Sequence, residues 1–172
     1  MSLINLDHGV IASLEIPDDW QNDVALQTEA LEIGGRSIRR VFSAANDEVR
    51  ICSYLRTIPI SATASQTFQS TLYSDLHELT SEEFLALAEI IEAMSYEEAF
   101  ERQLASTGHF EGRRSLRIDG VWTELQHQTD ALYFAADEKA STVQQLYFIA
   151  PVDLFALERP KAEQILRSVK WR

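Results

Sequence analysis

The sequence contains a single cysteine, Cys52, and no long run of apolar residues. One cysteine excludes a disulfide framework within the chain and is typical of proteins of the reducing cytoplasm. The first residues carry no basic segment followed by an apolar stretch, so we expect no signal peptide and a cytoplasmic location. The richest apolar run, Leu146 to Ala150, ends at Pro151 and is far shorter than the roughly 18 residues that a membrane span needs. We therefore predict a protein without a membrane segment.

Basic residues are also few, because 15 lysines and arginines stand against 27 aspartates and glutamates, for a formal net charge of -12. Like charges repel at long range, so this balance argues against a nucleic acid or an anionic membrane as the main partner. On a strand, Arg113 and Arg117 would share one side while Arg114 points to the other, so the three cannot form one phosphate-binding patch. A basic protein remains open as a partner.

Motifs for catalysis and metal binding are missing as well. The four histidines are scattered without the spacings of a zinc site, and no nucleophile elbow, phosphate-binding loop or dinucleotide fingerprint occurs. Cys52 lies in a predicted strand, where a small buried thiol is the expected role. We therefore expect no metal, no cofactor and no enzymatic activity.

Hydrophobic residues at 45% and charged residues at 24% suit a packed core, and 172 residues suit one domain, 1–172.

The first half of the chain alternates strand-like and helix-like patterns. Residues Val10 to Ile16 alternate with a period of two, which predicts a strand. The pair Gly34-Gly35 between two strand-like runs predicts a tight hairpin leading into the strand Ile38 to Phe42. A further strand is expected over Val49 to Ile58, and a modest amphipathic helix between Ser61 and Leu79.

Two capping boxes follow. Thr80 with Glu83 begins a helix, and Leu79 can pack on Phe84 as a hydrophobic staple. The apolar stripe of this helix loses its phase near Ser95, where Ser95-Tyr96-Glu97-Glu98 repeats the capping pattern. We therefore predict a central pair of capped helices, a helical insertion over about 80–105.

The patterns in the rest of the chain predict a meander of antiparallel strands joined by tight turns. Asp119-Gly120 predicts a hairpin whose second strand is Val121 to Gln128. Another hairpin is expected across Asp137-Glu138-Lys139, and Pro160 is placed at the first position of a short helix. Ser168 to Trp171 closes the chain as a strand. Together these patterns predict an α+β fold, a mostly antiparallel twisted sheet packed against helices.

The arrangement resembles the PsbP/DcrB-like α/β/α sandwich family over most of the chain. The similarity rests on the strand exit Ile16-Pro17-Asp18-Asp19-Trp20, the central helical segment, the meander, and the step Ile165-Leu166-Arg167-Ser168-Val169 from helix to strand. Members of that family act mainly as binding proteins, among them photosynthetic extrinsic subunits, a Ran-binding nuclear transport factor and chaperones for type VI secretion effectors. The resemblance implies a binding role and supplies no catalytic residue.

Two groups of residues are candidates for a binding site. Acidic side chains dominate the predicted helices, and such a surface can attract a cationic protein or simply be a solvated helix face. These partner-binding candidates are Glu82, Glu83, Glu89, Glu92, Glu97, Glu98 and Glu101. Aromatic residues in or beside strands can line an apolar cleft or fill the core. These cleft candidates are Trp20, Trp122, Tyr133 and Trp171.

These features favour a non-catalytic cytoplasmic module that binds another protein, as an immunity protein that neutralises a toxin or as a secretion-effector chaperone or adaptor. An inhibitor of a cationic enzyme should use the acidic helices, whereas a chaperone should present an apolar concavity on the sheet. The alternatives are a small-molecule binder or hydrolase with a cleft beside the sheet, and a purely structural subunit. The sequence does not define the oligomeric state.

Overall fold

A computed structural model describes residues 1–22, 37–56 and 58–172 of the chain. Seven of the described strands form one antiparallel sheet in the order β3-β4-β5-β9-β8-β7-β6. Their bounds are Gln21–Asn22 (β3), Ser37–Ser43 (β4), Arg50–Arg56 (β5), Phe100–Phe110 (β6), Arg113–Trp122 (β7), His127–Ala135 (β8) and Val143–Pro151 (β9). A small antiparallel sheet has the order β1-β2-β10, with bounds Ser2–Asn5, Ile11–Ile16 and Lys170–Trp171. The α+β class is therefore confirmed.

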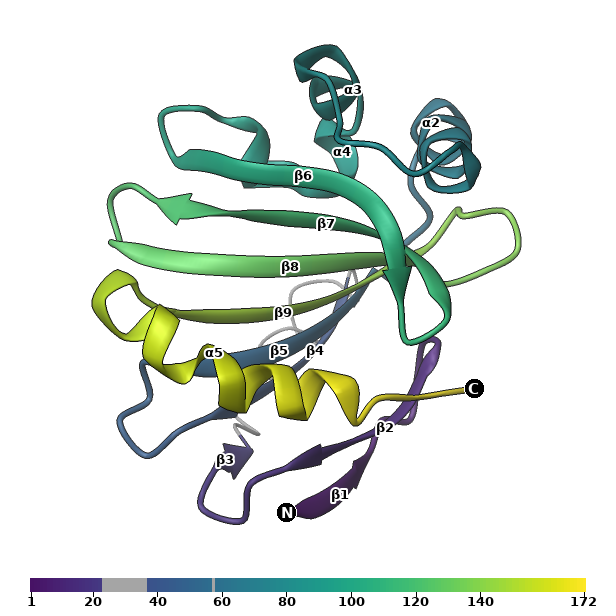
Figure 1. Ribbon diagram of the computed structural model, residues 1–172. Helices are drawn as coiled ribbons and strands as arrows, with labels where there is room; N and C mark the ends of the chain where they lie inside the picture. The colour runs from purple at the N-terminus through teal and green to yellow at the C-terminus, as the bar shows by residue number, and fades with distance from the viewer. Residues whose placement is uncertain (23–36, 57) are drawn as a thin grey trace.

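Helices lie on both sides of the large sheet (Figure 1). One side carries α2 (Ala62–Tyr73), α3 (Ser81–Ala86), α4 (Ala88–Ile91) and a 3-10 helix, η1 (Glu92–Ser95). The other side carries α5 (Val152–Arg167) and the small sheet. We call these two sides the α2 face and the α5 face. No helix among the described residues is long and apolar enough to cross a membrane.

Strands β8 and β9 bury side chains on both faces, which explains their short continuous apolar runs. In β8, Ala131 and Tyr133 belong to the core cluster of the α2 face, whereas Leu132 and Phe134 belong to that of the α5 face. This alternation follows from the period of two along a strand. The sheet therefore separates two apolar cores.

Most of the predicted elements are confirmed. The structure contains the predicted strands as β2, β4, β5 and β10, the predicted helix as α2, and the predicted hairpin between β8 and β9. The Thr80 hydroxyl accepts from the Glu83 N–H while the Glu83 carboxylate accepts from the Thr80 N–H, which is the expected capping box. Leu79 and Phe84 are buried in the same cluster. The Gly34-Gly35 hairpin lies outside the described residues.

The second predicted helix, from Ser95 to about Ala105, is wrong. The Ser95 hydroxyl donates to the Glu92 carbonyl at the end of η1, and residues from Phe100 onward form β6. Strand β6 pairs with β7 along its length, from Phe100 opposite Trp122 to Phe110 opposite Arg113. A capping box contributes only about 1 kcal/mol, so ten cross-strand residue pairs outweigh it. Only the Thr80 box begins a helix.

The turn predicted at Asp119-Gly120 is also wrong, because both residues lie within β7. The β7–β8 turn comes later, and Gln126 there has a φ of 52°. Gly120 serves packing instead: a Cβ on it would lie 2.4 Å from Cζ of Phe100 and 2.4 Å from the Glu101 carbonyl oxygen. The glycine lets the Phe100 ring approach the strand closely.

Pro160 does not begin a helix but lies inside α5. The helix buries Phe155 before the proline and Ala162 and Ile165 after it against the same core, so packing holds both halves in line. The proline removes one helical hydrogen bond to Ala156. Ala156 is exposed, so water can satisfy its carbonyl.

Candidate functional site

A pocket of about 340 Å³ opens on the α2 face, beside α4 and η1 and over β4, β5, β9 and β8. We call it the Arg39 pocket. Its lining comprises Arg39, Tyr54, Arg56, Ile90, Ile91, Glu92, Ala93, Met94, Trp122, Leu125, Thr129, Tyr133, Val143, Gln145, Tyr147 and Ile149. The helices of this face therefore leave part of the sheet uncovered by the described residues.

Strand register builds the floor of the pocket. Arg39 pairs with Tyr54 and Tyr54 pairs with Gln145. Gln145 in turn pairs with Tyr133 on β8. Residues paired directly across an antiparallel sheet point to the same face, so one cationic, one amide and two phenol side chains form a row across four strands. This row runs from the charged edge of the pocket to its buried end.

Two of the four aromatic cleft candidates, Trp122 and Tyr133, line this pocket. The other two are on the α5 face. Trp20 is buried there with the Lys161 ammonium 5.4 Å from its ring centroid, and Trp171 packs against Phe134. The four aromatics thus divide between the Arg39 pocket and the core of the α5 face.

The polar groups at the floor of the pocket are mostly satisfied and uncharged. The Tyr133 hydroxyl accepts from Gln145 Nε2 at 3.0 Å, and lies 3.3 Å from Met94 Sδ. Trp122 Nε1 donates to the Thr129 hydroxyl at 2.9 Å. Burial raises the pKa of both Tyr133 and Tyr147, so their hydroxyls stay neutral. These groups offer a ligand an apolar surface with few free hydrogen bonds.

Cys52 lies opposite Tyr147 on the adjacent strand and has no disulfide. Burial raises the pKa of its thiol to about 11, so the thiol is protonated at neutral pH. A protonated, buried thiol is a poor nucleophile. The expectation of a small buried thiol is confirmed.

The two arginines of the pocket differ in their partners. Arg56 donates to the Glu89 carbonyl at 2.6 Å and forms an ion pair with Glu92 at 3.5 Å. Arg39 lies with its guanidinium 5.9 Å from the Tyr54 ring centroid, and its buried Nε has no hydrogen-bond partner among the described residues. No carboxylate of the described residues forms an ion pair with Arg39, so its charge faces the pocket uncompensated.

Three of the acidic candidates serve the local structure. Glu83 caps α3 and lies 2.9 Å from Nε2 of His77, so the pKa of Glu83 is lowered by the Thr80 N–H and then by His77. Glu89 accepts from the Ser61 hydroxyl and N–H, which lowers its pKa. Glu92 is the partner of Arg56. These carboxylates are already occupied.

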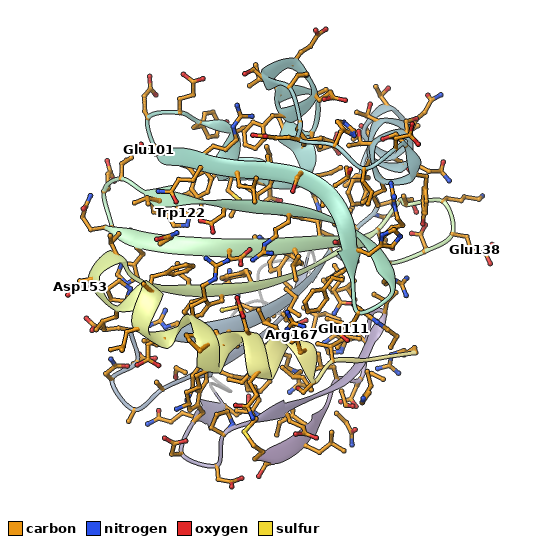
Figure 2. The ribbon with its side chains drawn as sticks, viewed as in Figure 1. Glu101, Glu111, Trp122, Glu138, Asp153 and Arg167 are labelled. Carbon is orange, nitrogen blue, oxygen red and sulfur yellow. The ribbon has the colours of Figure 1, made fainter. Side chains whose placement is uncertain are left out.

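The remaining four, Glu82, Glu97, Glu98 and Glu101, are exposed, and their carboxylates have no ion pair or hydrogen bond within the described part of the chain. Glu97 and Glu101 line a second pocket of about 260 Å³ together with Leu85 and Phe100. Figure 2 shows Glu101 near Trp122, at the same end of β6 and β7.

Two large apolar side chains stand among these acids, Leu85 with 56% and Tyr96 with 66% of their surface exposed. We call the four acids with Leu85 and Tyr96 the acidic surface. Arg102 is the cation among the described residues that line the second pocket, and its guanidinium lies 4.5 Å from the Phe84 ring centroid. The surface therefore combines a net negative charge with apolar contact area.

Arg39 is the site residue that sequence reasoning missed. Its signal is present in the sequence, since Arg39, Val41, Cys52 and Tyr54 fall on one side of two neighbouring strands by the period of two. The pairing of β5 with β9, distant in the sequence, then adds Gln145 and Tyr147. That long-range pairing could not be read from local patterns.

Among the described residues, no group of three histidine, cysteine, aspartate or glutamate side chains could hold a metal ion.

No family model and no curated protein matches the sequence. The fold, however, has solved counterparts. LpqN, involved in cell envelope biogenesis of Mycobacterium tuberculosis, is 12% identical, and the match covers 99% of this chain and 89% of LpqN with a TM-score of 0.54.

The solution structure of cyanobacterial PsbP (CyanoP) from Synechocystis sp. PCC 6803 is 7% identical, with a TM-score of 0.56 over 99% of this chain and 92% of that protein. The fold is PsbP-like. The resemblance expected from the strand exit at Trp20 and the closing step from α5 to β10 is thus confirmed at the level of the fold. Within this PsbP-like fold, the Arg39 pocket and the acidic surface both lie on the α2 side of the sheet.

Proposed function

We propose that this PsbP-like chain is a non-catalytic cytoplasmic module that binds another protein through the acidic surface. The observation that carries the proposal is the acidic surface itself, in which four carboxylates without described partners accompany exposed Leu85 and Tyr96, and two of them line a 260 Å³ pocket with Leu85. Isolated exposed apolar residues are ordinary, but apolar contact area beside a pocket and rimmed by charge is typical of protein interfaces.

The charge of the surface defines the kind of partner. Uncompensated carboxylates attract a protein that presents lysine or arginine side chains, and they accelerate its association at low salt. A basic side chain can pair with Glu97 or Glu101, which outnumber Arg102 on the lining of this pocket, while its apolar neighbours contact Leu85. This arrangement favours an inhibitor of a cationic protein, such as an immunity protein.

A chaperone role receives less support from the geometry. The apolar concavity on the sheet, the Arg39 pocket, has a volume of about 340 Å³. That is near the lower end of the range for small-molecule sites, and it has no room for a client helix about 10 Å across. Binding by the acidic surface therefore remains the first proposal, with the cytoplasm as the proposed location.

Site-specific photocrosslinking in an extract of the source cells tests the proposal. A photoreactive residue replaces Leu85 in one sample and Leu157, which is 72% exposed on α5, in the other. We expect a discrete crosslinked protein at low salt from position 85 and none from position 157. Crosslinking at 85 should fall at least tenfold in the Glu97→Gln/Glu98→Gln/Glu101→Gln variant and at high salt.

A charge-matched control carries Glu15→Gln, Glu48→Gln and Glu138→Gln, three exposed acids away from the acidic surface. This control should crosslink as the unmodified protein does. Equal loss in both triple variants would show that net charge alone is responsible, and the proposal would then be wrong. An absence of any crosslink at position 85 would also contradict it.

A small-molecule-binding role is the second candidate, and the Arg39 pocket favours it. Binding is a better account of this pocket than hydrolysis, because burial raises the pKa values of Tyr133 and Tyr147 away from neutrality.

A further inference from the structure

The Arg39 pocket is distinct from the acidic surface, since its lining includes none of the six residues that define that surface. We propose that it binds a small organic acid, with one carboxylate on Arg39 and an apolar, ring-sized body against Trp122, Met94 and Ile149. This inference does not depend on a protein partner.

The first support is the unmatched charge of Arg39. Its buried Nε has no partner among the described residues, although a buried donor without a hydrogen bond costs about 1–3 kcal/mol. A carboxylate presents two oxygens to the planar fork of a guanidinium, and such paired hydrogen bonds are among the strongest in proteins. A carboxylate ligand would therefore compensate the charge of Arg39 through the part of the guanidinium that lines the pocket.

The second support is the contrast with Arg56 and Glu92, the other charged residues of the lining. These two residues form an ion pair at 3.5 Å, so their opposite charges largely cancel. The cation of Arg39 is then the charge left to select a ligand. In a chain with a formal charge of -12, one unpaired arginine in a pocket favours an anion where the rest of the protein repels it.

The third support is the chemistry of the remaining lining. Trp122 Nε1 and the Tyr133 hydroxyl already have partners, so they contribute mainly ring surface. Ile90, Ile149 and Met94 add aliphatic and thioether surface. Pockets for small molecules are mostly apolar with a few polar groups that fix orientation, and a volume of about 340 Å³ admits one aromatic or bicyclic body.

Isothermal titration with three naphthalene compounds of equal size tests the inference. The probes are 2-naphthoate, neutral 2-naphthylmethanol and cationic 2-naphthylmethylammonium. We expect 2-naphthoate to bind at least tenfold more tightly than the alcohol, and the ammonium compound to bind most weakly, because only the carboxylate satisfies Arg39. Equal affinities for the three, or no binding of 2-naphthoate at millimolar concentration, would overturn the inference.

Variants test whether Arg39 is the residue that binds the carboxylate of 2-naphthoate. Arg39→Gln should lower the affinity for 2-naphthoate at least tenfold and leave that for the alcohol nearly unchanged. Arg39→Lys, which keeps the charge but loses the planar fork, should have an intermediate effect. Arg167→Gln, on α5, is the matched control and should bind as the unmodified protein does. Retained preference for 2-naphthoate in Arg39→Gln would contradict the inference, whatever the outcome of the crosslinking at Leu85.

Discussion

The two faces of the large sheet are built from alternate residues of the same strands, yet along β9 they differ in how completely they are filled. On the α5 face, Leu146 and Phe148 are fully buried, and the Phe148 ring stacks on Phe155 of α5 with centroids 4.7 Å apart. On the α2 face, the neighbouring side chains Tyr147 and Ile149 line a pocket. Along β9, one side of the sheet is therefore filled and the other borders a pocket.

The two faces also differ in whether their charged side chains form ion pairs. Asp130 is buried on the α5 face, where it accepts from Arg117 Nε at 2.8 Å and lies 3.7 Å from Arg159 Nη2. Arg39 on the α2 face has no carboxylate partner among the described residues. A paired buried charge fixes a structure, whereas an unpaired one is available to a ligand.

The largest expected effect tests packing on adjacent residues of β9. Phe148→Ala should lower the free energy of unfolding by about 3–5 kcal/mol, because it leaves a cavity in a filled core. Ile149→Ala should cost about 1–2 kcal/mol, since its side chain already borders a pocket. Urea unfolding of both variants measures the difference. Equal costs would mean that the α2 face is as tightly filled as the α5 face.

The second prediction compares the charges. Asp130→Asn should lower the free energy of unfolding by about 2 kcal/mol, because it leaves Arg117 and Arg159 without their shared counter-ion. Arg39→Gln should change it by no more than about 0.5 kcal/mol. The same urea titrations give both values. A loss from Arg39→Gln as large as that from Asp130→Asn would show that Arg39 is structural.

The smallest effect concerns the start of α3 and the end of η1, both on the α2 face. Thr80→Ala removes the capping box of α3 and should cost about 1 kcal/mol. Ser95→Ala removes only the hydroxyl bond to the Glu92 carbonyl and should cost less than about 0.5 kcal/mol. Thermal unfolding of the two single variants distinguishes them. A larger loss at Ser95 would contradict the assignment of Ser95 to the end of η1.

These two capping boxes show what local sequence could predict. Both have the same pattern, but residues after Thr80 have no strand partner and form a helix, whereas residues after Ser95 find one in β7. Long-range pairing was invisible in the local pattern. In the same way, Asp119-Gly120 has the residues of a turn, yet Gly120 is needed for the approach of the Phe100 ring.

The candidate site was predictable only in part, because local patterns do not show which distant strands pair. Trp122 and Tyr133 were candidates for a cleft, and both line the Arg39 pocket, although Trp122 is opposite His127 and Tyr133 is opposite Leu116 in the pairing of β7 with β8. Trp20 and Trp171 share their chemistry but point into the α5 core. Arg39 was overlooked because its neighbours in the pocket come from β9, about a hundred residues away.

Mapping of amide and indole NMR signals during titration with 2-naphthoate tests the contrast between the faces most directly. We predict shifts at Arg39, Tyr54, Tyr147 and the Trp122 indole, and none along α5 or at the Trp171 indole. Shifts centred on α5, or spread evenly over both sides of the sheet, would contradict the assignment of recognition to the α2 face.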